Sequence, residues 1–416
     1  MRALLVSLLV AAAPAFAAPD DDAKALSLAD QAEAAPEAGR DWRVFAEAAV
    51  RESALRSGQS STHGNRWSID LRYDGRLAPG WRAVFADRLD VIRVSGSGQT
   101  EINTLKEAYL SWQARPDRAA DLGRVNVRHG VALGYNPTDF FRAGALRSVV
   151  SIDPASLREN RLGSVMLRGQ TLWEGGSLAA LYSPKLAERP HGGSYDVELG
   201  ATNAHSRGLA VFSQKISEDL QPQFLLYNAP GESTQLGVNL TRLLNDATVA
   251  FAEWSGGRSR SLLARALSLT EDPVFRSRFS GGATYTTASN LSLTLEYEYN
   301  GTGLDRARWD ALRSGPLPAY AAYRAFAANL QEPVTRHHWF LYAAWTDAMI
   351  PHLDLTAMVR HDAADRSRLH WFEARYHWTQ VDVALQAQFN HGDPSSDFGA
   401  LPERRGAQIL LKYFFQ

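Results

Sequence analysis

The sequence predicts a closed antiparallel β-barrel that spans a membrane through about 18 strands, with 16 strands as the alternative. Three observations predict this fold. Segments of roughly ten residues alternate apolar and polar side chains, as tilted membrane strands do. The connections between these segments alternate between tight and long. Beyond the first residues, no apolar run approaches the roughly 20 residues that a membrane-spanning helix needs.

The alternation is clearest at residues 291–300 (LSLTLEYEYN), where every odd position is Leu or Tyr and every even position is polar. Residues 66–75, 368–378 and 381–390 show the same pattern. Successive side chains of a strand point to opposite faces, so each segment has one apolar and one polar face.

Read in this way, the chain contains 18 candidate strands. They lie at 42–54, 66–76, 80–93, 103–114, 122–130, 162–172, 176–183, 207–216, 220–228, 234–243, 247–255, 277–287, 290–300, 335–346, 352–361, 367–378, 380–391 and 406–416. The strand at 176–183 and residues 184–206 decide between 18 strands and 16.

The connections sort by length. The tight ones include 77–80, 173–176, 287–290 and 378–380, and the long ones include 131–161, 184–206, 256–276, 301–334 and 392–405. Single-chain bacterial barrels have short periplasmic turns, long outer loops and an even number of strands. A soluble β-sandwich has no reason to sort its loops in this way. Helical spacing at 309–330 predicts a short helix over the rim.

The two ends of the chain predict the outer membrane of a Gram-negative bacterium. Arg2, an apolar run and the Ala15-Phe16-Ala17 site predict a signal peptide at 1–17. Residues 18–40 are expected to form a periplasmic tail, and residues 41–416 the barrel. The last strand alternates up to the penultimate Phe415. It resembles the C-terminal strand that the barrel assembly machinery reads in outer-membrane proteins, so we expect that machinery and outer-membrane lipid as partners.

Composition excludes several other classes. The chain has no cysteine, so it has no disulfide framework, no thiolate metal site and no covalently attached haem. The formal net charge of −1 gives no reason to expect nucleic acid as a partner. There is no GxSxG, HExxH or P-loop motif. We therefore expect no catalytic residue, no cofactor, no metal ligand and no enzyme.

A barrel of this size leaves an aqueous lumen, and the connection 131–161 is expected to fold into it as the third outer loop. This loop carries Phe140, Phe141, Val149 and Val150, more apolar side chains than a free surface loop should expose. We therefore expect it to narrow the pore.

Arginine is concentrated around this loop, with seven arginines against three acids between residues 124 and 168. We expect Val125 and Val127 to face lipid, so that the residues between them face the lumen. The expected pore lining is Arg124, Asn126, Arg128, Arg142, Arg147, Arg158, Arg161, Arg168 and Gln170. Such a constriction would favour anions. Alternatively, the arginines pair with the acids and pin the loop to the wall.

The segments GYNPTDFF (134–141) and DPASLREN (153–160) carry a family resemblance. They resemble a signature of proteobacterial outer-membrane barrels related to alginate-export-like and porin-like proteins. The resemblance implies a loop between two barrel strands and an outer-membrane channel for polar or anionic solutes. A Pro flanked by Asn and Asp favours a turn, and the two Phe would anchor it. The expected loop anchor is Asn136, Pro137, Asp139, Phe140 and Phe141.

Other functions stay open as alternatives. One is an export conduit that works with periplasmic and inner-membrane partners. Another is a hydrolase at the barrel rim, where His361 with Asp362 and His391 with Asp393 are candidates. Arg128-His129-Gly130 is similar to the phosphate-binding motif of histidine phosphatases, but the second arginine of that motif is absent. We expect it to end a strand instead. The sequence also leaves a homo-oligomer open.

Overall fold

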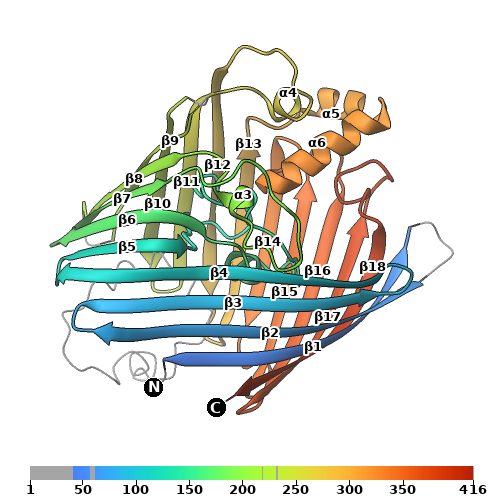
Figure 1. Cartoon of the computed structure of the whole chain (residues 1–416). Helices are drawn as coiled ribbons and strands as arrows, with labels where there is room; N and C mark the ends of the chain where they lie inside the picture. The colour runs from blue at the N-terminus through green and yellow to red at the C-terminus, as the bar shows by residue number, and fades with distance from the viewer. Residues whose placement is uncertain (1–40, 57–60, 218, 231–232, 416) are drawn as a thin grey trace.

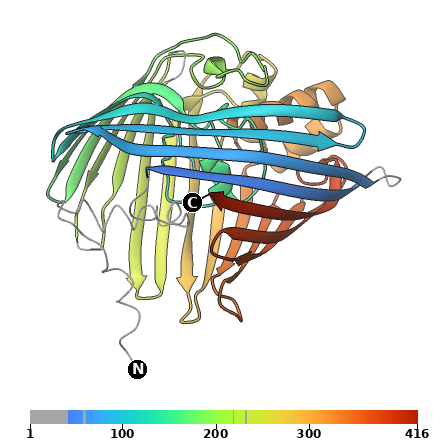
Figure 2. The ribbon, with the colours of Figure 1, turned by 60° about the horizontal axis from the view of Figure 1, so that its bottom comes forward.

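The computed structural model describes residues 41–56, 61–217, 219–230 and 233–415. The segments predicted as signal peptide (1–17) and periplasmic tail (18–40) lie outside the described residues. The described chain forms a single 18-stranded antiparallel sheet in sequence order, in which β1 pairs with both β2 and β18. The sheet is therefore closed, as the meeting of the first and last strands in Figures 1 and 2 shows. The prediction of an 18-stranded barrel is confirmed.

The strands and helices have the following bounds. The strands are β1 (Trp42–Leu55), β2 (Ser61–Ala78), β3 (Trp81–Val94), β4 (Gly98–Arg115), β5 (Arg118–Val125), β6 (Ser164–Trp173), β7 (Gly176–Ser183), β8 (Arg207–Gln214), β9 (Gln223–Asn228), β10 (Gln235–Asn245), β11 (Thr248–Ser259), β12 (Val274–Thr286), β13 (Leu291–Asn300), β14 (His337–Trp345), β15 (Leu353–Asp362), β16 (Arg368–His377), β17 (Val381–His391) and β18 (Glu403–Phe415). The helices are α2 (Pro154–Glu159), α3 (Leu199–Thr202), α4 (Leu262–Ala266), α5 (Arg306–Arg313) and α6 (Leu317–Leu330). None of the helices in the described ranges has the length and apolar character to cross a membrane.

The outer surface of the barrel is an apolar belt. Trp67 and Ile69 on β2, for example, are 63% and 56% exposed, although both are large apolar side chains. Aromatic pairs stand where strands meet the tight turns, among them Trp42 with Tyr73, Trp81 with Trp112, and Tyr376 with Trp378. An apolar band bordered by aromatic rings is the surface that a barrel presents to lipid. The chain is therefore a membrane-spanning barrel.

The connections are sorted by length between the two ends of the barrel. One end, the turn end, carries connections as short as 79–80, 116–117 and 246–247. The other, the loop end, carries the long connections 126–163, 184–206 and 301–336. Helices α4, α5 and α6 gather there, at the top of Figure 1. Trp309 of α5 and Tyr323 of α6 are fully buried in an apolar cluster of their own, so these helices form an ordered cover.

An apolar cluster lies on the inner side of the wall, where we had expected polar side chains. Its wall members come from β6 to β9: Met166, Leu181, Leu209, Val211, Leu225 and Tyr227. The 126–163 connection covers them with Phe140, which stacks on Tyr227 at 4.6 Å between ring centroids, and with Phe141. The connection therefore folds into the lumen, as predicted, and an apolar contact seats its base.

The same cluster overturns the orientation that we predicted for the strand before the loop. Val125 and Val127 are buried in the cluster and do not face lipid. Arg124 lies opposite Val165 in the register of β5 and β6. It is on the same face of β5 as Leu122, whose side chain is 63% exposed on the lipid side. The prediction assumed that apolar side chains point outward. That assumption fails where a loop replaces water on the inner face.

The strand also ends earlier than predicted, at Val125 instead of 130. The backbone N–H of Asn126 already donates to the Glu107 side chain, and Gly163 takes the place beside β4 by donating to the Lys106 carbonyl at 2.9 Å. Arg128, His129 and Gly130 therefore belong to the loop that crosses the lumen.

Candidate functional site

Two buried glutamates on the far wall hold the beginning of the lumen loop. Glu253 on β11 accepts hydrogen bonds from the backbone N–H groups of Val131 and Ala132, at 3.0 and 3.3 Å, and from that of Thr138 at 2.7 Å. It also accepts from the Thr138 hydroxyl at 2.8 Å and the Asn136 amide at 3.3 Å. One carboxylate thus satisfies five donors of a loop that would otherwise present bare N–H groups to the wall.

Glu296 on β13 repeats this arrangement one step further along the loop. Its carboxylate accepts from the backbone N–H groups of Leu133, Gly134 and Tyr135 at 3.0 to 3.1 Å. The Ser280 hydroxyl of β12 donates to it at 2.5 Å. Because β11 and β13 lie across the lumen from β5, these bonds carry the loop from one wall to the other.

A buried ion pair joins the lumen loop to the 301–336 connection above it. Arg142 and Glu332 meet at 2.6 Å, and Arg278 of β12 approaches the same carboxylate at 3.0 Å. The Tyr135 hydroxyl donates to the other carboxylate oxygen at 2.5 Å. Burial alone would raise the pKa of Glu332, but Arg142 and Arg278 outweigh it and lower the pKa. Glu332 is therefore ionised at neutral pH.

The other arginines of the loop also have structural partners. Arg161 bonds to Asp139 at 2.7 Å and to the Asn126 amide oxygen at 2.8 Å, and Arg158 donates to the Ala132 carbonyl at 2.7 Å. Arg147 donates to the carbonyls of Gly193 and Asp196 in the neighbouring loop. These side chains fasten loop to loop.

Helix α2 crosses the lumen as a strut. At its N-terminus Asp153 caps the helix by accepting from the Ser156 N–H, and its other oxygen accepts from the Tyr342 hydroxyl of β14 at 2.9 Å. At its C-terminus Glu159 pairs with Arg43 of β1 at 3.2 Å and with Lys106 of β4 at 3.6 Å. The strut therefore connects walls that lie far apart around the barrel.

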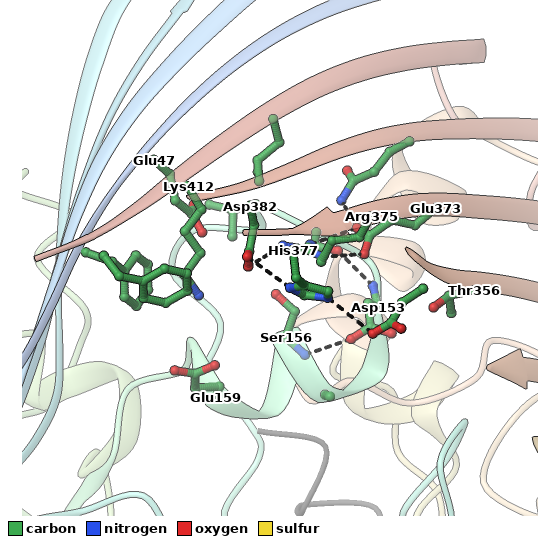
Figure 3. A pocket seen from close by; sticks show the side chains of 18 of the residues that line it. Glu47, Asp153, Ser156, Glu159, Thr356, Glu373, Arg375, His377, Asp382 and Lys412 are labelled. Atoms are coloured by element: carbon green, nitrogen blue, oxygen red, sulfur yellow. Dashed lines mark hydrogen bonds and ion pairs between the residues drawn. The ribbon is translucent and has the colours of Figure 1, made fainter. Parts of the chain in front are cut away.

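A cavity of about 810 Å³ lies between this strut and the inner faces of β1 to β3 and β14 to β18. Figure 3 shows Asp153, Ser156 and Glu159 on the loop side, opposite the strand residues His377, Asp382 and Lys412. The lining is highly charged. Its cations are Arg43, Arg66, Arg88, Arg128, Arg375 and Lys412, with His377 beside them, and its acids are Glu47, Asp153, Glu159, Asp354, Glu373 and Asp382.

All six acids of the cavity have partners. Besides Asp153 and Glu159, Glu47 is bound by Arg88 at 2.6 Å and by Arg66 at 2.8 Å. Glu373 is bound by Arg375, and His377 bridges Asp354 and Asp382. Each carboxylate in the lining is thus engaged by a cation, an imidazole or a hydrogen-bond donor.

Lys412 is different from these groups. Its ammonium lies 3.7 Å from the ring centroid of Phe45 and 4.8 Å from that of Phe414. Its cross-strand neighbours Glu47 and Asp382 are engaged by other cations, and no described carboxylate forms an ion pair with it. Cation–π contacts leave the hydrogen-bond donors of an ammonium unused. The cavity therefore offers a positive donor to an anion.

The structure brings only part of the predicted pore lining to the cavity. Arg128 lines the cavity. Asn126 does not line it, and its amide oxygen accepts a hydrogen bond from Arg161 within the loop. Arg124 is covered by the 184–206 loop, donating to the carbonyls of Val197 and Gly163. Arg168 pairs with Asp121, and Gln170 lies on the same inward face of β6. Arg142, Arg158 and Arg161 are 6%, 8% and 3% exposed, so they line no open passage.

All the expected loop anchors lie within the lumen loop where it contacts the wall. Asn136 bonds to Glu253, Asp139 to Arg161, and Phe140 and Phe141 join the apolar cluster, with Pro137 buried between them. Glu253 and Glu296, the acceptors of residues 131–138, were not predicted from the sequence, and neither was Lys412. Each occupies an inward polar position in an alternating strand. That position predicts which way the side chain points but does not predict which group it binds.

Asp153 offers a test of the strut. Burial raises the pKa of Asp153 above its usual value of 3.8. The protonated carboxyl therefore stabilises the folded state relative to the unfolded state. This stabilisation is complete below pH 3.8 and is lost as the pH rises through the raised pKa. We expect Asp153→Asn to keep the helix cap and to be as stable as the parent near neutral pH, or slightly more stable. Unfolding measured between about pH 3 and 8 should show a weaker gain on acidification in the variant. An equal pH profile in both proteins would contradict this assignment.

Comparison with known proteins relates this chain to others by structure alone. No family model and no curated protein matches the sequence. Among solved structures, OccK2 (OpdF) of Pseudomonas aeruginosa is similar with a TM-score of 0.55 at 11% identity, over 90% of this chain and 98% of that one. OpdQ of the same organism gives 0.54 at 11%, over 91% and 99%. A structure of OccK2 in complex with glucuronate gives 0.54 at 10%, over 90% and 97%.

These similarities cover nearly the whole of each chain, so the fold is shared from the first strand to the last. Together with the closed sheet and the apolar belt, they confirm the prediction of a membrane-spanning β-barrel fold.

Proposed function

We propose that this chain is an outer-membrane channel for small anionic solutes, and that the cavity beside α2 is their site of passage. The observation that carries the proposal is the imbalance in pairing among the cavity charges. All six carboxylates are engaged by cations or hydrogen-bond donors, whereas the Lys412 ammonium rests on two aromatic rings. A solute carboxylate or phosphate can therefore gain a charge-assisted contact without first displacing a protein anion.

Two further features support this function. A barrel of 18 strands is wide enough for a water-filled lumen, and the loop and α2 reduce that lumen to a charged cavity without filling it. The OccK2 structure in complex with glucuronate shows that a barrel of this fold can bind a small carboxylate.

Conductance in planar bilayers tests the proposal. The purified protein should form steady single channels whose reversal potential in a salt gradient is biased toward the anion. Lys412→Met keeps the contact with Phe45 and removes the charge, so we expect the anion-to-cation permeability ratio to fall by roughly twofold or more. Arg128→Ala should act in the same direction.

Arg242→Met is the matched control, because Arg242 lies on the exposed side of β10, where it pairs with Asp219 at 3.0 Å. It should leave the permeability ratio unchanged. No conductance from the folded barrel, even after removal of residues 135–160, would sink the channel proposal. A bias that survives Lys412→Met and Arg128→Ala would place the selectivity elsewhere.

A further inference from the structure

Three ionisable side chains from separate segments converge at the loop end of the barrel. His338 is the second residue of β14, Asp362 ends β15, and Asp397 lies in the connection between β17 and β18. One atom from each group, the imidazole Nε2 and one oxygen of each carboxylate, lies within 4.8 Å of the other two. His338 and Asp362 are 4% and 0% exposed, and the Asp397 side chain is 17% exposed. The groups are thus held together beneath the surface.

Their distances suit a divalent metal ion. His338 Nε2 lies 3.3 Å from Asp362 Oδ2 and 3.8 Å from Asp397 Oδ2. Tetrahedral zinc, with bonds of about 2.0 to 2.2 Å to nitrogen and oxygen, sets its ligand atoms roughly 3.4 Å apart. These two separations lie on either side of that value, so small movements would let the three groups occupy three of the four positions of a tetrahedral site.

Each carboxylate is oriented by contacts to one oxygen, while its other oxygen lies toward His338, and this second oxygen of Asp362 also accepts from the Thr335 hydroxyl. Asp362 Oδ1 accepts from the N–H groups of Ala364 and Asp365, at 2.7 and 3.3 Å. Asp397 Oδ1 faces Arg324 of α6 at 3.3 Å. Contacts of this kind, behind the ligands themselves, fix ligand orientation in metal sites.

A second observation points to the same place. Glu298 on β13 is the direct cross-strand neighbour of His338 and is 1% exposed. Neither of its carboxylate oxygens has a hydrogen-bond partner among the described residues, and its nearest ion pair is with Arg360 at 3.9 Å. The Nδ1 of His338 is likewise buried without such a partner. A buried carboxylate usually has hydrogen bonds, so Glu298 is a spare acidic group beside the cluster.

We propose that His338, Asp362 and Asp397 form a binding site for a divalent transition-metal ion, with Zn²⁺ the best fit. An imidazole with two carboxylates matches the nitrogen and oxygen ligands of zinc. Calcium takes six to eight oxygen ligands, more than this cluster supplies.

The consequence is a clip on the loop end of the barrel. The three ligands tie β14 and β15 to the 392–402 connection, and Arg324 extends the tie to α6 through Asp397. Thr335, in the connection that carries α5 and α6, donates to Asp362 Oδ2 at 2.8 Å. Metal binding would therefore order the outer cover of the barrel. This inference does not rest on conduction.

Metal titration of the full-length protein in detergent tests the site. The protein is stripped with EDTA and titrated with Zn²⁺ in competition with a chromogenic chelator. Separately, Co²⁺ is added, and its visible bands report tetrahedral coordination. We expect one ion per chain and intense tetrahedral Co²⁺ bands. Asp397→Asn, a loop substitution that keeps side-chain shape, should weaken Zn²⁺ binding by at least about 10-fold. Asp362→Asn should do the same.

His191→Ala is the matched control, because His191 also pairs with an aspartate, Asp196, at 2.9 Å, but in an exposed loop. It should leave Zn²⁺ affinity unchanged. Heat-dependent gel mobility verifies that each variant is a folded barrel. The proposal is overturned if the stripped parent binds no Zn²⁺, which would leave the cluster as a purely ionic contact. It is also overturned if Asp397→Asn and Asp362→Asn bind as the parent does, for instance through the neighbouring rings of His370 and His391.

Discussion

Replacing Glu253 by alanine should release the lumen loop and raise single-channel conductance by roughly twofold or more. Glu253 is fully buried and accepts five hydrogen bonds from residues 131–138. Hydrogen bonds to a charged group contribute about 1.5 to 3 kcal/mol each. Without the carboxylate, the backbone N–H groups of Val131, Ala132 and Thr138 lose their acceptor, and they regain hydrogen bonds by moving into the water of the lumen. The recording should show larger and noisier channels.

Two companion variants sharpen this measurement. Glu253→Gln keeps one acceptor oxygen but turns an amide N–H₂ toward the loop donors, so its conductance should lie between those of the parent and the alanine variant. Glu174→Ala alters an acid in the two-residue turn between β6 and β7 and should change nothing. If Glu253→Ala conducts like the parent, the loop is held in place mainly by its apolar base at Phe140 and Phe141.

The second large effect is expected for stability. Arg142→Met should lower the free energy of unfolding by about 3 to 5 kcal/mol, because it leaves the buried Glu332 without its closest partner. Arg142 also donates to the Leu330 carbonyl at 3.2 Å, and Gln331 donates back to the Arg142 carbonyl at 2.6 Å. These contacts join the lumen loop to the cover formed by α5 and α6. Urea unfolding in lipid vesicles measures the change.

The exposed pair Arg242–Asp219 again supplies the control, because solvent-exposed ion pairs contribute little to stability. Arg242→Met should therefore leave the free energy of unfolding close to that of the parent. A loss of similar size in both variants would mean that the methionine itself disturbs the barrel. A loss below about 1 kcal/mol in Arg142→Met would mean that Arg278 alone can compensate Glu332.

The sequence predicted the barrel well because lipid imposes a simple rule. Backbone groups must pair along closed strands, and the side chains that face hydrocarbon must be apolar. Alternation therefore located all 18 strands, including β7 at 176–183, which decided against 16. The sorting of tight and long connections followed from the same geometry, since every odd-numbered strand leads to the loop end.

The same rule failed where the inner face of the wall is not wet. At Val125 and Val127 the pattern predicted lipid, but Phe140 and Phe141 cover that part of the wall from inside. Alternation gives two faces and does not say which one is outward when both are apolar. Here only the pairing of Asp121 with Arg168, and the exposure of Leu122, settle the orientation.

The arginines show a second limit of the sequence. Their concentration between residues 124 and 168 indicated a charged lumen loop. It did not indicate which guanidinium groups form hydrogen bonds within the loop. Arg158 and Arg161 bond to carbonyls and an aspartate of the loop itself, and these acceptors are set by its folded path. Lys412 lies far from these arginines in the sequence and was not predicted to line the pore. Its ammonium lies over the rings of Phe45 and Phe414, so it is better placed than the arginines to contact an anion.

The bonds between the lumen loop and Glu253 and Glu296 also bear on how the protein is made. Thr138 precedes its acceptor Glu253 by 115 residues in the chain. Tyr135 precedes its acceptor Glu296 by 161 residues. Contacts over such separations form late, since the intervening chain must first be ordered. Until β11 and β13 are in place, the apolar inner faces of β6 to β9 have only part of their cover secured. Seating of the loop is therefore a late event in maturation, and a protease that cleaves the unseated loop would distinguish a half-built wall from a finished one.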